Sequence, residues 1–289
     1  MGKRDLYKLI DETNKRRFIN YNCYNIDKMG NDRFVSDTIY MLSMEFRRYF
    51  SSNEKRFREQ ETIKIVDIGP AHGAIGTCFF LMIINEFNLL DKVQLCLIDP
   101  VEEVINDNRN INFPLKETIE LIYKKLYGKE LDSDELNKLF HLFKNLFNNA
   151  IGVKEKIQCF KAGKKNETYD VSICTFSLHH IHPDHKSKAL KVVIDLLKPK
   201  GFFAFADEWF GENYYEQFLL GRNHIQDPIP FEFPESPEDL IQRLKQKISL
   251  IKIIYDEKEA FMLSGHKRIF EDKRKTGHYP DIDYFNIDI

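Results

Sequence analysis

From Thr62 onward, short apolar runs alternate with stretches whose apolar residues recur every three or four positions. This alternation is typical of parallel strands joined by crossover helices. The runs predict strands at 63–68, 93–99, 156–160, 171–176 and 202–207. Between the last two strands, residues 186–197 predict a helix with its apolar positions on one face, which completes a crossover unit.

The last part of this region departs from the crossover pattern. Two apolar runs, 250–255 and 260–269, are separated only by Asp256 to Glu259. A connection this short cannot hold a crossover helix, so the two runs predict an antiparallel hairpin. A dinucleotide-binding domain would instead continue with another crossover helix. The pattern therefore predicts an α/β fold with a doubly wound, mostly parallel seven-stranded sheet that ends in an antiparallel hairpin.

Three segments lie outside this predicted sheet. Residues 1–60 contain a strongly amphipathic helix at 33–50, and residues 101–155 interrupt the connection after the second strand with further helices. Residues 208–235 form a loop rich in aromatic side chains. The helical apolar stripes are typical of core packing. We divide the chain into an N-terminal helical segment (1–60), a main domain (61–270) and a C-terminal tail (271–289) without a regular apolar period.

Composition places the chain among ordinary globular proteins. Hydrophobic residues make up 43% of its 289 residues, and 45 acidic and 43 basic residues are interspersed. Because no long basic run could neutralise a phosphate backbone, non-specific nucleic-acid binding is not expected. Five widely spaced cysteines without a CxxC pair predict buried thiols in a reducing compartment. Because the N-terminus lacks an apolar signal region and no segment approaches 18 apolar residues, we expect a cytoplasmic protein without a membrane segment.

The most specific chemical signal is the junction after the first strand. Asp67 closes that strand, and Gly69 and Gly73 bracket a tight loop before an apolar helix at 74–87. Free amides at the start of such a helix can face a polar group, which indicates a nucleotide-like ligand. The acidic residue and the glycine spacing resemble the first motif of class I S-adenosylmethionine (SAM) methyltransferases more than a dinucleotide fingerprint.

The resemblance to class I SAM-dependent methyltransferases covers roughly residues 60–270. It implies SAM as the cofactor and S-adenosylhomocysteine as the product. By this resemblance, Asp67 orients the loop and the methionine amine, Gly69 lets the backbone approach the ligand, and Pro70, Ala71 and Gly73 complete the loop. Ala71 stands where the family usually has glycine. Its methyl group is tolerable if the backbone there remains at negative φ.

The second motif matches the pattern of the family, and the third departs from it. Asp99, followed by Pro100, ends the second strand and lies where the family has a carboxylate that accepts both ribose hydroxyls. After the third predicted strand the family often has an acidic or polar residue that reads adenine, whereas this chain has Phe160 and Lys161. The resemblance then implies that adenine is held by packing on Phe160 and by backbone groups.

The fourth motif, residues 169–181, resembles the family's fourth strand and its following Leu-His-His segment. Ligands in open α/β sheets lie beyond the carboxyl ends of the strands. Thr175 and Phe176 are therefore candidates for the cofactor wall, and His179 or His180 could reach the acceptor.

A general base is optional, because the sulfonium methyl of SAM is already activated. If the acceptor is a hydroxyl or an acidic carbon, His180 or His179 is the best candidate, since imidazole can take a proton at neutral pH. Asp207 and Glu208, at the end of the fifth strand, are second choices. The histidines at 179–185 also suggest zinc, but the paired ligands of a zinc site are missing, so no metal is predicted.

The sequence therefore predicts a methyltransferase that acts on a small or medium, partly apolar or aromatic acceptor. The resemblance implies that residues 1–60 and 208–235 form a lid over the acceptor pocket. Three alternatives stay open: a tRNA or protein methyltransferase, a partner protein that binds SAM without catalysis, and a nicotinamide-dependent reductase. The sequence does not specify the acceptor or the oligomeric state.

Overall fold

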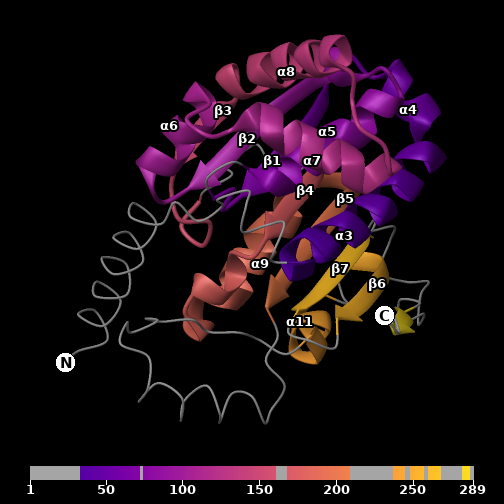
Figure 1. The fold of residues 1–289 in the computed structure, drawn as a ribbon. Coiled ribbons are helices and arrows are strands. Elements are labelled where there is room, and N and C mark those ends of the chain that lie inside the picture. The colour runs from indigo at the N-terminus through magenta and orange to yellow at the C-terminus, as the bar shows by residue number, and fades with distance from the viewer. Residues whose placement is uncertain are drawn as a thin grey trace, which may run out of the picture.

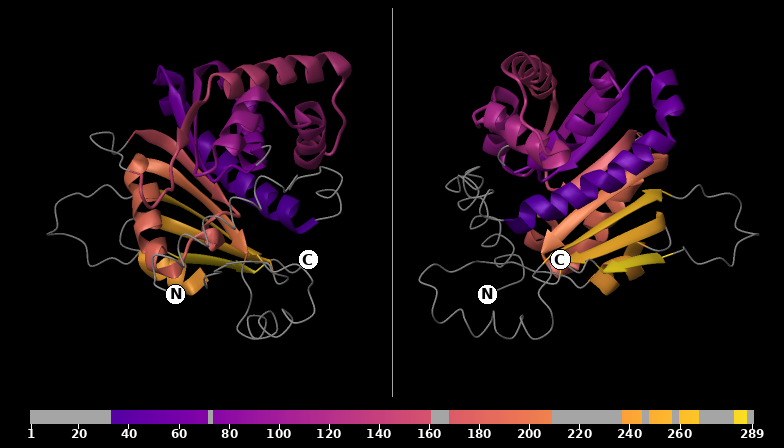
Figure 2. Two further views of the ribbon diagram at one scale, coloured as in Figure 1. Left: turned by 90° about the vertical axis from the view of Figure 1, so that its left-hand side faces the viewer. Right: turned by 45° about the vertical axis from the view of Figure 1, so that its right-hand side comes forward.

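A computed structural model describes residues 33–71, 74–160, 168–208, 237–244, 248–256, 260–267 and 282–286. Within these ranges one sheet carries helices on both of its faces (Figures 1 and 2). The strands are β1 (Ile63–Ile68), β2 (Val93–Asp99), β3 (Ile151–Lys154), β4 (Tyr169–Thr175), β5 (Leu197–Glu208), β6 (Ile248–Asp256), β7 (Ala260–Lys267) and β8 (Ile282–Asn286). The helices are α3 (Arg33–Ser52), α4 (Glu54–Glu59), α5 (Ile75–Glu86), α6 (Glu102–Asn110), α7 (Leu115–Tyr127), α8 (Ser133–Asn148), α9 (Pro183–Leu196) and α11 (Pro237–Leu244), with short 3-10 turns η1 (Leu90–Lys92) and η3 (Leu178–His180).

The strand order is β3-β2-β1-β4-β5-β7-β6-β8. Strands β3, β2, β1, β4 and β5 run parallel to one another, whereas β7 runs antiparallel to both β5 and β6. Strand β7 therefore returns between β5 and β6, which confirms the predicted terminal hairpin and the mostly parallel α/β sheet.

The predicted number of seven strands is wrong, because the described sheet has eight. The additional strand, β8, comes from the segment predicted as a tail, and it pairs in parallel with β6 from Ile251↔Ile282 to Tyr255↔Asn286. An edge strand is bonded along one side only. The sequence Ile-Asp-Tyr-Phe-Asn also lacks the clean alternation by which a half-buried strand is predicted.

The third strand was predicted in the wrong place. Strand β3 pairs with β2 from Cys96↔Ile151 to Asp99↔Lys154, upstream of the predicted 156–160. Residues 157–159 form a turn instead, in which the amides of Cys159 and Phe160 donate to the Lys156 carbonyl at 2.8 and 3.0 Å. Cys159 is therefore exposed rather than buried. The short edge strand β3 is mostly exposed, so its sequence gives only a weak apolar signal. The turn at 157–159 was predicted as a strand because it contains an apolar residue, Ile157, which is buried.

The strands bury apolar side chains on both faces of the sheet. Ile63 and Ile65 of β1 belong to a core shared with α3, α5, α7 and α8. Val66 and Ile68 of the same strand belong to a second core shared with α9 and α11. Burial on both faces explains why the central strands are nearly continuous apolar runs.

Helix α3 contributes to the first of these cores. The ring of Phe46 stacks on Phe80 of α5, with centroids 4.2 Å apart, and lies 5.5 Å from the ring of Phe202 on β5. Residues 1–32, which make up the rest of the predicted cap, lie outside the described residues.

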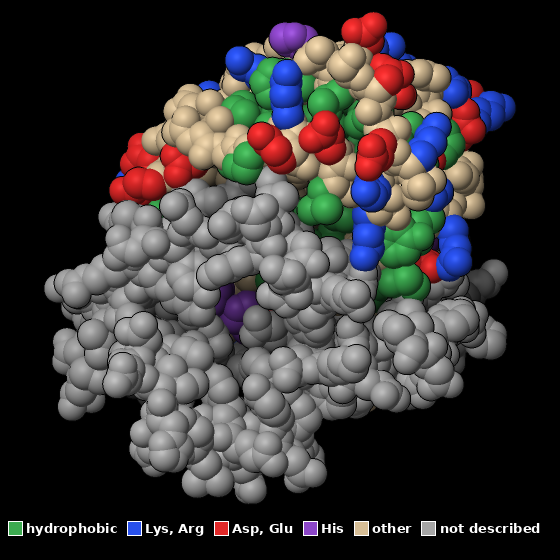
Figure 3. Space-filling model, in the orientation of Figure 1, with side chains coloured by type: hydrophobic (Ala, Val, Ile, Leu, Met, Phe, Trp, Pro, Cys, Tyr) green, Lys and Arg blue, Asp and Glu red, His purple; other side chains and the backbone are tan. Residues whose placement is uncertain are grey.

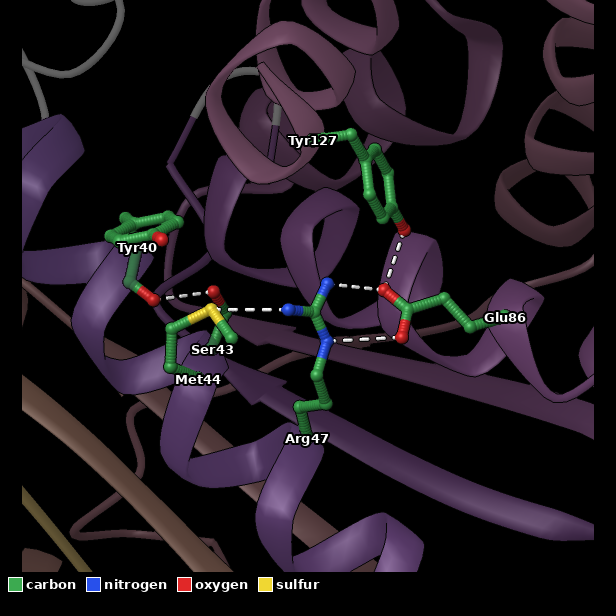
Figure 4. Close-up of polar contacts among 6 residues, drawn as sticks. All are labelled: Tyr40, Ser43, Met44, Arg47, Glu86 and Tyr127. Atoms are coloured by element: carbon green, nitrogen blue, oxygen red, sulfur yellow. Dashed lines mark hydrogen bonds and ion pairs between the residues drawn. The ribbon is translucent and has the colours of Figure 1, made fainter. Parts of the chain in front are cut away.

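Polar contacts at the rim of this core join three helices (Figure 4). The guanidinium of Arg47 on α3 makes two hydrogen bonds to the carboxylate of Glu86 on α5, of which Nε to Oε2 is 3.0 Å. The hydroxyl of Tyr127 on α7 donates to Glu86 Oε1 at 2.6 Å. Helix α3 is thus tied to α5 and α7 by both apolar and polar contacts. No helix in the described ranges is long and apolar enough to cross a membrane.

Candidate active site

Several of the predicted site residues lie at the carboxyl ends of the parallel strands. Asp67, at the end of β1, is paired with Leu97 of β2 and with Ile173 of β4. Asp99 ends β2, and Thr175 ends β4. Because neighbouring parallel strands end at one edge of the sheet, this arrangement places both carboxylates along the edge where open α/β sheets bind ligands.

Asp67 is a buried carboxylate with only part of its hydrogen-bonding capacity used. Its side chain accepts a 2.6 Å hydrogen bond from Thr77 Oγ1 at Oδ2, and the residue is 2% exposed. Its Oδ1 atom is buried and has no hydrogen-bond partner among the described residues. Burial raises the pKa of Asp67 to about 7, although hydrogen bonds from Thr77 and the Ile68 backbone act in the opposite direction. A ligand that donates a hydrogen bond to Oδ1 would remove an unfavourable buried acceptor.

Gly69 occupies a position that only glycine fits. Its φ of +65° is left-handed, and a Cβ atom there would lie 2.4 Å from Ser177 Oγ. Ser177 Oγ donates to the Gly69 carbonyl at 2.7 Å, while the Gly69 amide donates to the Ile98 carbonyl at 2.8 Å. The turn after β1 is thus held by hydrogen bonds to Ser177, which follows β4, and to Ile98, near the end of β2. Ser177 was not predicted as a site residue, because nothing local indicates which carbonyl its hydroxyl reaches.

The backbone at Ala71 does not have the negative φ that would make an alanine tolerable at this position. Its φ is +52°, in the left-handed region, rather than negative. A buried side chain outside the turn contacts this residue: Asn108 Nδ2 on α6 donates to the Ala71 carbonyl at 2.6 Å. Asn108 was missed by the sequence prediction, because its contact with Ala71 depends on where α6 packs in the folded chain. Pro70 is buried, and Gly73 lies outside the described residues.

Asp99 is the second buried carboxylate of this edge. It is 7% exposed, and its Oδ1 atom accepts a 2.7 Å hydrogen bond from the Val101 amide, just before α6 begins. Burial raises the pKa of Asp99 to about 7, the nearby charge of Asp67 raises it further, and the Val101 amide opposes both. Pro100, next in the chain, is exposed.

The end of β4 approaches the glycine loop and helix α5. Thr175 is half-buried, and its Oγ1 atom lies 3.1 Å from where a Cβ atom on Gly76 would be. Phe176 has a φ of +51°, and its amide donates to the Ala206 carbonyl of β5 at 2.7 Å. Left-handed residues at 69, 71, 74 and 176 therefore gather around this edge of the sheet. Such clustering of backbone strain is typical of functional sites.

The two candidate histidines differ in their surroundings. His179 is 4% exposed, and its ring Nδ1 contacts Asp207 Oδ1, while its amide donates to Asp207 Oδ2 at 3.0 Å. His180 is half-buried, with its ring centroid 4.0 Å from that of His179. The structure thus brings both histidines to the ends of β4 and β5, and Asp207 holds one of them.

The remaining predicted residues are placed less directly. Glu208 is the last residue of β5, and Phe160 is half-buried after the turn at 157–159, where it packs on the second core. Lys161 lies outside the described residues, and so does the predicted aromatic loop at 208–235 except for Glu208. Within the described ranges, no group of three His, Cys, Asp or Glu side chains is arranged to hold a metal ion.

No protein-family model matches this chain, and no curated protein matches it in sequence. Several solved structures of low sequence identity are similar to this chain, with TM-scores below 0.5. The N-methyltransferase NodS from Bradyrhizobium japonicum WM9, crystallised with S-adenosylhomocysteine, is 12% identical, with 89% of this chain and 98% of that chain covered and a TM-score of 0.48. A SAM-dependent methyltransferase from Aquifex aeolicus is 16% identical, with 75% and 88% covered and a TM-score of 0.41.

A third similar structure, the CurJ carbon methyltransferase, is 12% identical over 73% of this chain, with a TM-score of 0.44. This chain spans half of the length of that protein. All three similarities concern the arrangement of strands and helices, and none of them assigns a role to a residue of this chain.

Proposed function

We propose that this chain is a SAM-dependent methyltransferase that acts on a small or medium, partly apolar or aromatic acceptor. The observation that carries the proposal is Asp67, a buried carboxylate whose Oδ1 atom lacks a partner among the described residues. It lies beside the left-handed turn at Gly69 and on the strand next to a second buried carboxylate, Asp99.

The two carboxylates fit the polar groups of SAM. Among the described residues neither forms an ion pair with a basic side chain, so hydrogen bonds offset only part of their desolvation. Hydrogen-bond donors of a cationic ligand would relieve that desolvation. Asp67 would hold the methionine amine, and Asp99 would accept hydrogen bonds from the ribose hydroxyls. When bound, SAM would supply a methyl group already activated by its sulfonium sulfur.

The protein would contribute mainly position. Holding donor and acceptor in line can lower a barrier by roughly 7–11 kcal/mol in well-oriented cases. His180 is the better general base of the two histidines, because it is less buried and Asp207 already engages His179. His179 and Asp207 would then hold the η3 turn that presents His180. Glu208 remains a second choice, and residues 1–60 and 208–235 are proposed as the lid over the acceptor.

Two of the alternative functions receive less support. A nicotinamide-dependent reductase required the hairpin prediction to be wrong, and β5, β7 and β6 form the antiparallel arrangement that was predicted. On the face shown in Figure 3, acidic and basic side chains are interspersed over the described helices. A mixed surface favours a small acceptor over the phosphate backbone of a tRNA.

The proposal is tested by calorimetric titration of the pure protein with SAM and with S-adenosylhomocysteine. We expect both to bind, and we expect Asp99→Ala to weaken binding at least tenfold, since the ribose hydroxyls lose their acceptor. Asp91→Ala, on an exposed carboxylate before β2, is the control and should bind normally. Absence of binding, or equal binding by Asp99→Ala, would overturn the proposal. A screen of metabolite and tRNA fractions with labelled SAM would then identify the acceptor class.

A further inference from the structure

The carbonyl of Ala71 is anchored to a helix far along the chain. Asn108 of α6 is 0% exposed, and its Nδ2 group donates to the Ala71 carbonyl at 2.6 Å and to the Val104 carbonyl at 2.9 Å. Ala71 itself has a φ of +52°. This conformation is energetically unfavourable for an L-residue that has a Cβ atom. We therefore expect contacts outside the turn to maintain it.

The helix that carries Asn108 also begins at the second carboxylate. Asp99 Oδ1 accepts a hydrogen bond from the Val101 amide, and α6 starts at the next residue, Glu102. The last turn of α6 then reaches Ala71 through Asn108. One short helix therefore contacts both the glycine loop and the segment after Asp99, the two parts of the chain that the proposed function assigns to SAM.

We propose that Asn108 is a positioning residue for the cofactor loop. By fixing the Ala71 carbonyl, it holds a strained loop in the shape needed by the ligand before the ligand arrives. It also keeps that loop in register with Asp99 through α6. This inference rests on the proposed function, and it adds a residue on α6 that contacts the loop rather than the ligand.

The strain at Ala71 makes the role testable. A glycine at this position adopts a left-handed conformation readily, so the loop should need Asn108 less when residue 71 is glycine. A residue that merely stabilised α6 would have the same effect whether residue 71 were alanine or glycine. The decisive variants are therefore Asn108→Ala, Ala71→Gly and the two combined. Asn110→Ala, at an exposed position of the same helix, is the control.

The experiment measures the Kd of each variant for S-adenosylhomocysteine by calorimetry, together with its free energy of unfolding in urea without ligand. We expect Asn108→Ala to weaken binding about 3- to 10-fold, as for the loss of one buried hydrogen bond. Ala71→Gly alone should change binding less than about 2-fold, and in the Asn108→Ala background it should recover most of the lost affinity. Asn110→Ala should bind as the wild type does.

The outcomes separate the two proposals. If the wild-type protein binds neither SAM nor S-adenosylhomocysteine, the proposed function fails, and the cofactor role of Asn108 fails with it. If the wild type binds and Asn108→Ala binds equally well, only the positioning role is overturned. Recovery by Ala71→Gly supports the role, and its absence assigns Asn108 to helix packing alone. If Asn108→Ala does not fold, the double variant decides: a folded, binding double variant supports the role, and an unfolded one overturns it.

Discussion

The ring Nδ1 of His179 lies against the Oδ1 atom of Asp207, although the two residues are 28 positions apart in the sequence. Each is 4% exposed, and the second carboxylate oxygen of Asp207 accepts the His179 amide at 3.0 Å. The pair therefore joins the η3 turn after β4 to the end of β5. Its consequence for function is that the backbone next to His180 is fixed by a buried carboxylate.

We expect this pair to be strongly coupled in stability. His179→Ala and Asp207→Ala should each lower the free energy of unfolding by about 2–4 kcal/mol, because each leaves a buried polar partner unmatched. The double variant should lose about 1–3 kcal/mol less than the sum of the single losses. Urea unfolding of the four proteins measures this difference.

The ion pair of Lys191 and Asp195 on α9 is exposed, and it serves as the control for the buried pair of His179 and Asp207. Lys191→Ala should change stability by less than about 0.5 kcal/mol, since exposed pairs contribute little. Strictly additive losses at His179 and Asp207 would show that the two side chains stabilise the fold independently.

The stability of the ligand-free protein should depend on the buried acid Asp67. Burial raises its pKa from 3.8 to about 7, so between these values the folded state binds a proton that the unfolded state has released. Stability should therefore fall as the pH rises from about 4 to about 7. Urea unfolding at several pH values tests this, with Asp67→Asn as the variant in which the decline should be smaller. An equal decline in wild type and variant would assign the pH dependence to other groups.

Ligand affinity should follow the opposite trend. A cationic ligand binds the ionised form of Asp67, so the affinity for SAM should increase as the pH rises through about 7. Asp99, whose pKa is also raised to about 7, should contribute in the same direction. Calorimetric titrations at pH 6, 7 and 8 would measure the slope. Affinity that is constant over this range would mean that neither carboxylate changes its ionisation on binding.

Alanine substitutions at two glycines with positive φ separate the effect of backbone strain from the effect of a steric clash. At Gly69 an added Cβ would lie 2.4 Å from Ser177 Oγ, whereas at Gly128 it would meet no described residue within 4 Å apart from its chain neighbours. Gly128→Ala should therefore lower stability only by the left-handed strain, about 1–2 kcal/mol. Gly69→Ala should lower it by roughly 1–3 kcal/mol more, and it should also weaken SAM binding. Equal losses in urea unfolding would show that the Ser177 side chain moves aside freely.

The sequence predicted the centre of the fold better than its edges. Strands β1 and β2 match their predicted ranges residue for residue, because strands buried on both faces give uninterrupted apolar runs. Strands β3 and β8 were missed because each has a neighbour on one side only and β3 is largely exposed. Their positions depend on pairing with β2 and β6, which a local pattern does not contain.

The same distinction holds for the site. Asp67, Gly69 and Asp99 were predicted because a strand, a turn and a carboxylate follow one another in the sequence. The contact of Asn108 with Ala71 could not be predicted, because it depends on where α6 packs after folding. The left-handed φ of Ala71 was missed for the same reason, since alanine gives no local signal for that conformation.

Helix α3 packs in the core of the domain, although it belongs to the segment proposed as a lid. Its Phe46 is 0% exposed and stacks on Phe80, in the core that covers one face of the sheet. Phe46→Ala should therefore lower the free energy of unfolding of the whole domain by about 3–5 kcal/mol, in a single cooperative transition. Far-UV circular dichroism and intrinsic fluorescence, followed in one urea titration, should shift together. Ser51→Ala, at an exposed position of the same helix, should leave the transition unchanged.

If residues 1–60 instead formed a lid independent of the sheet, Phe46→Ala would release only that segment. The main transition would then stay at its wild-type urea concentration, and an early partial loss of helical signal would precede it. A single shifted transition would mean that, within residues 1–60, any lid motion is confined to the chain before α3. The reason is that Phe46, and the ion pair of Arg47 with Glu86, tie α3 to the same core that supports Asp67.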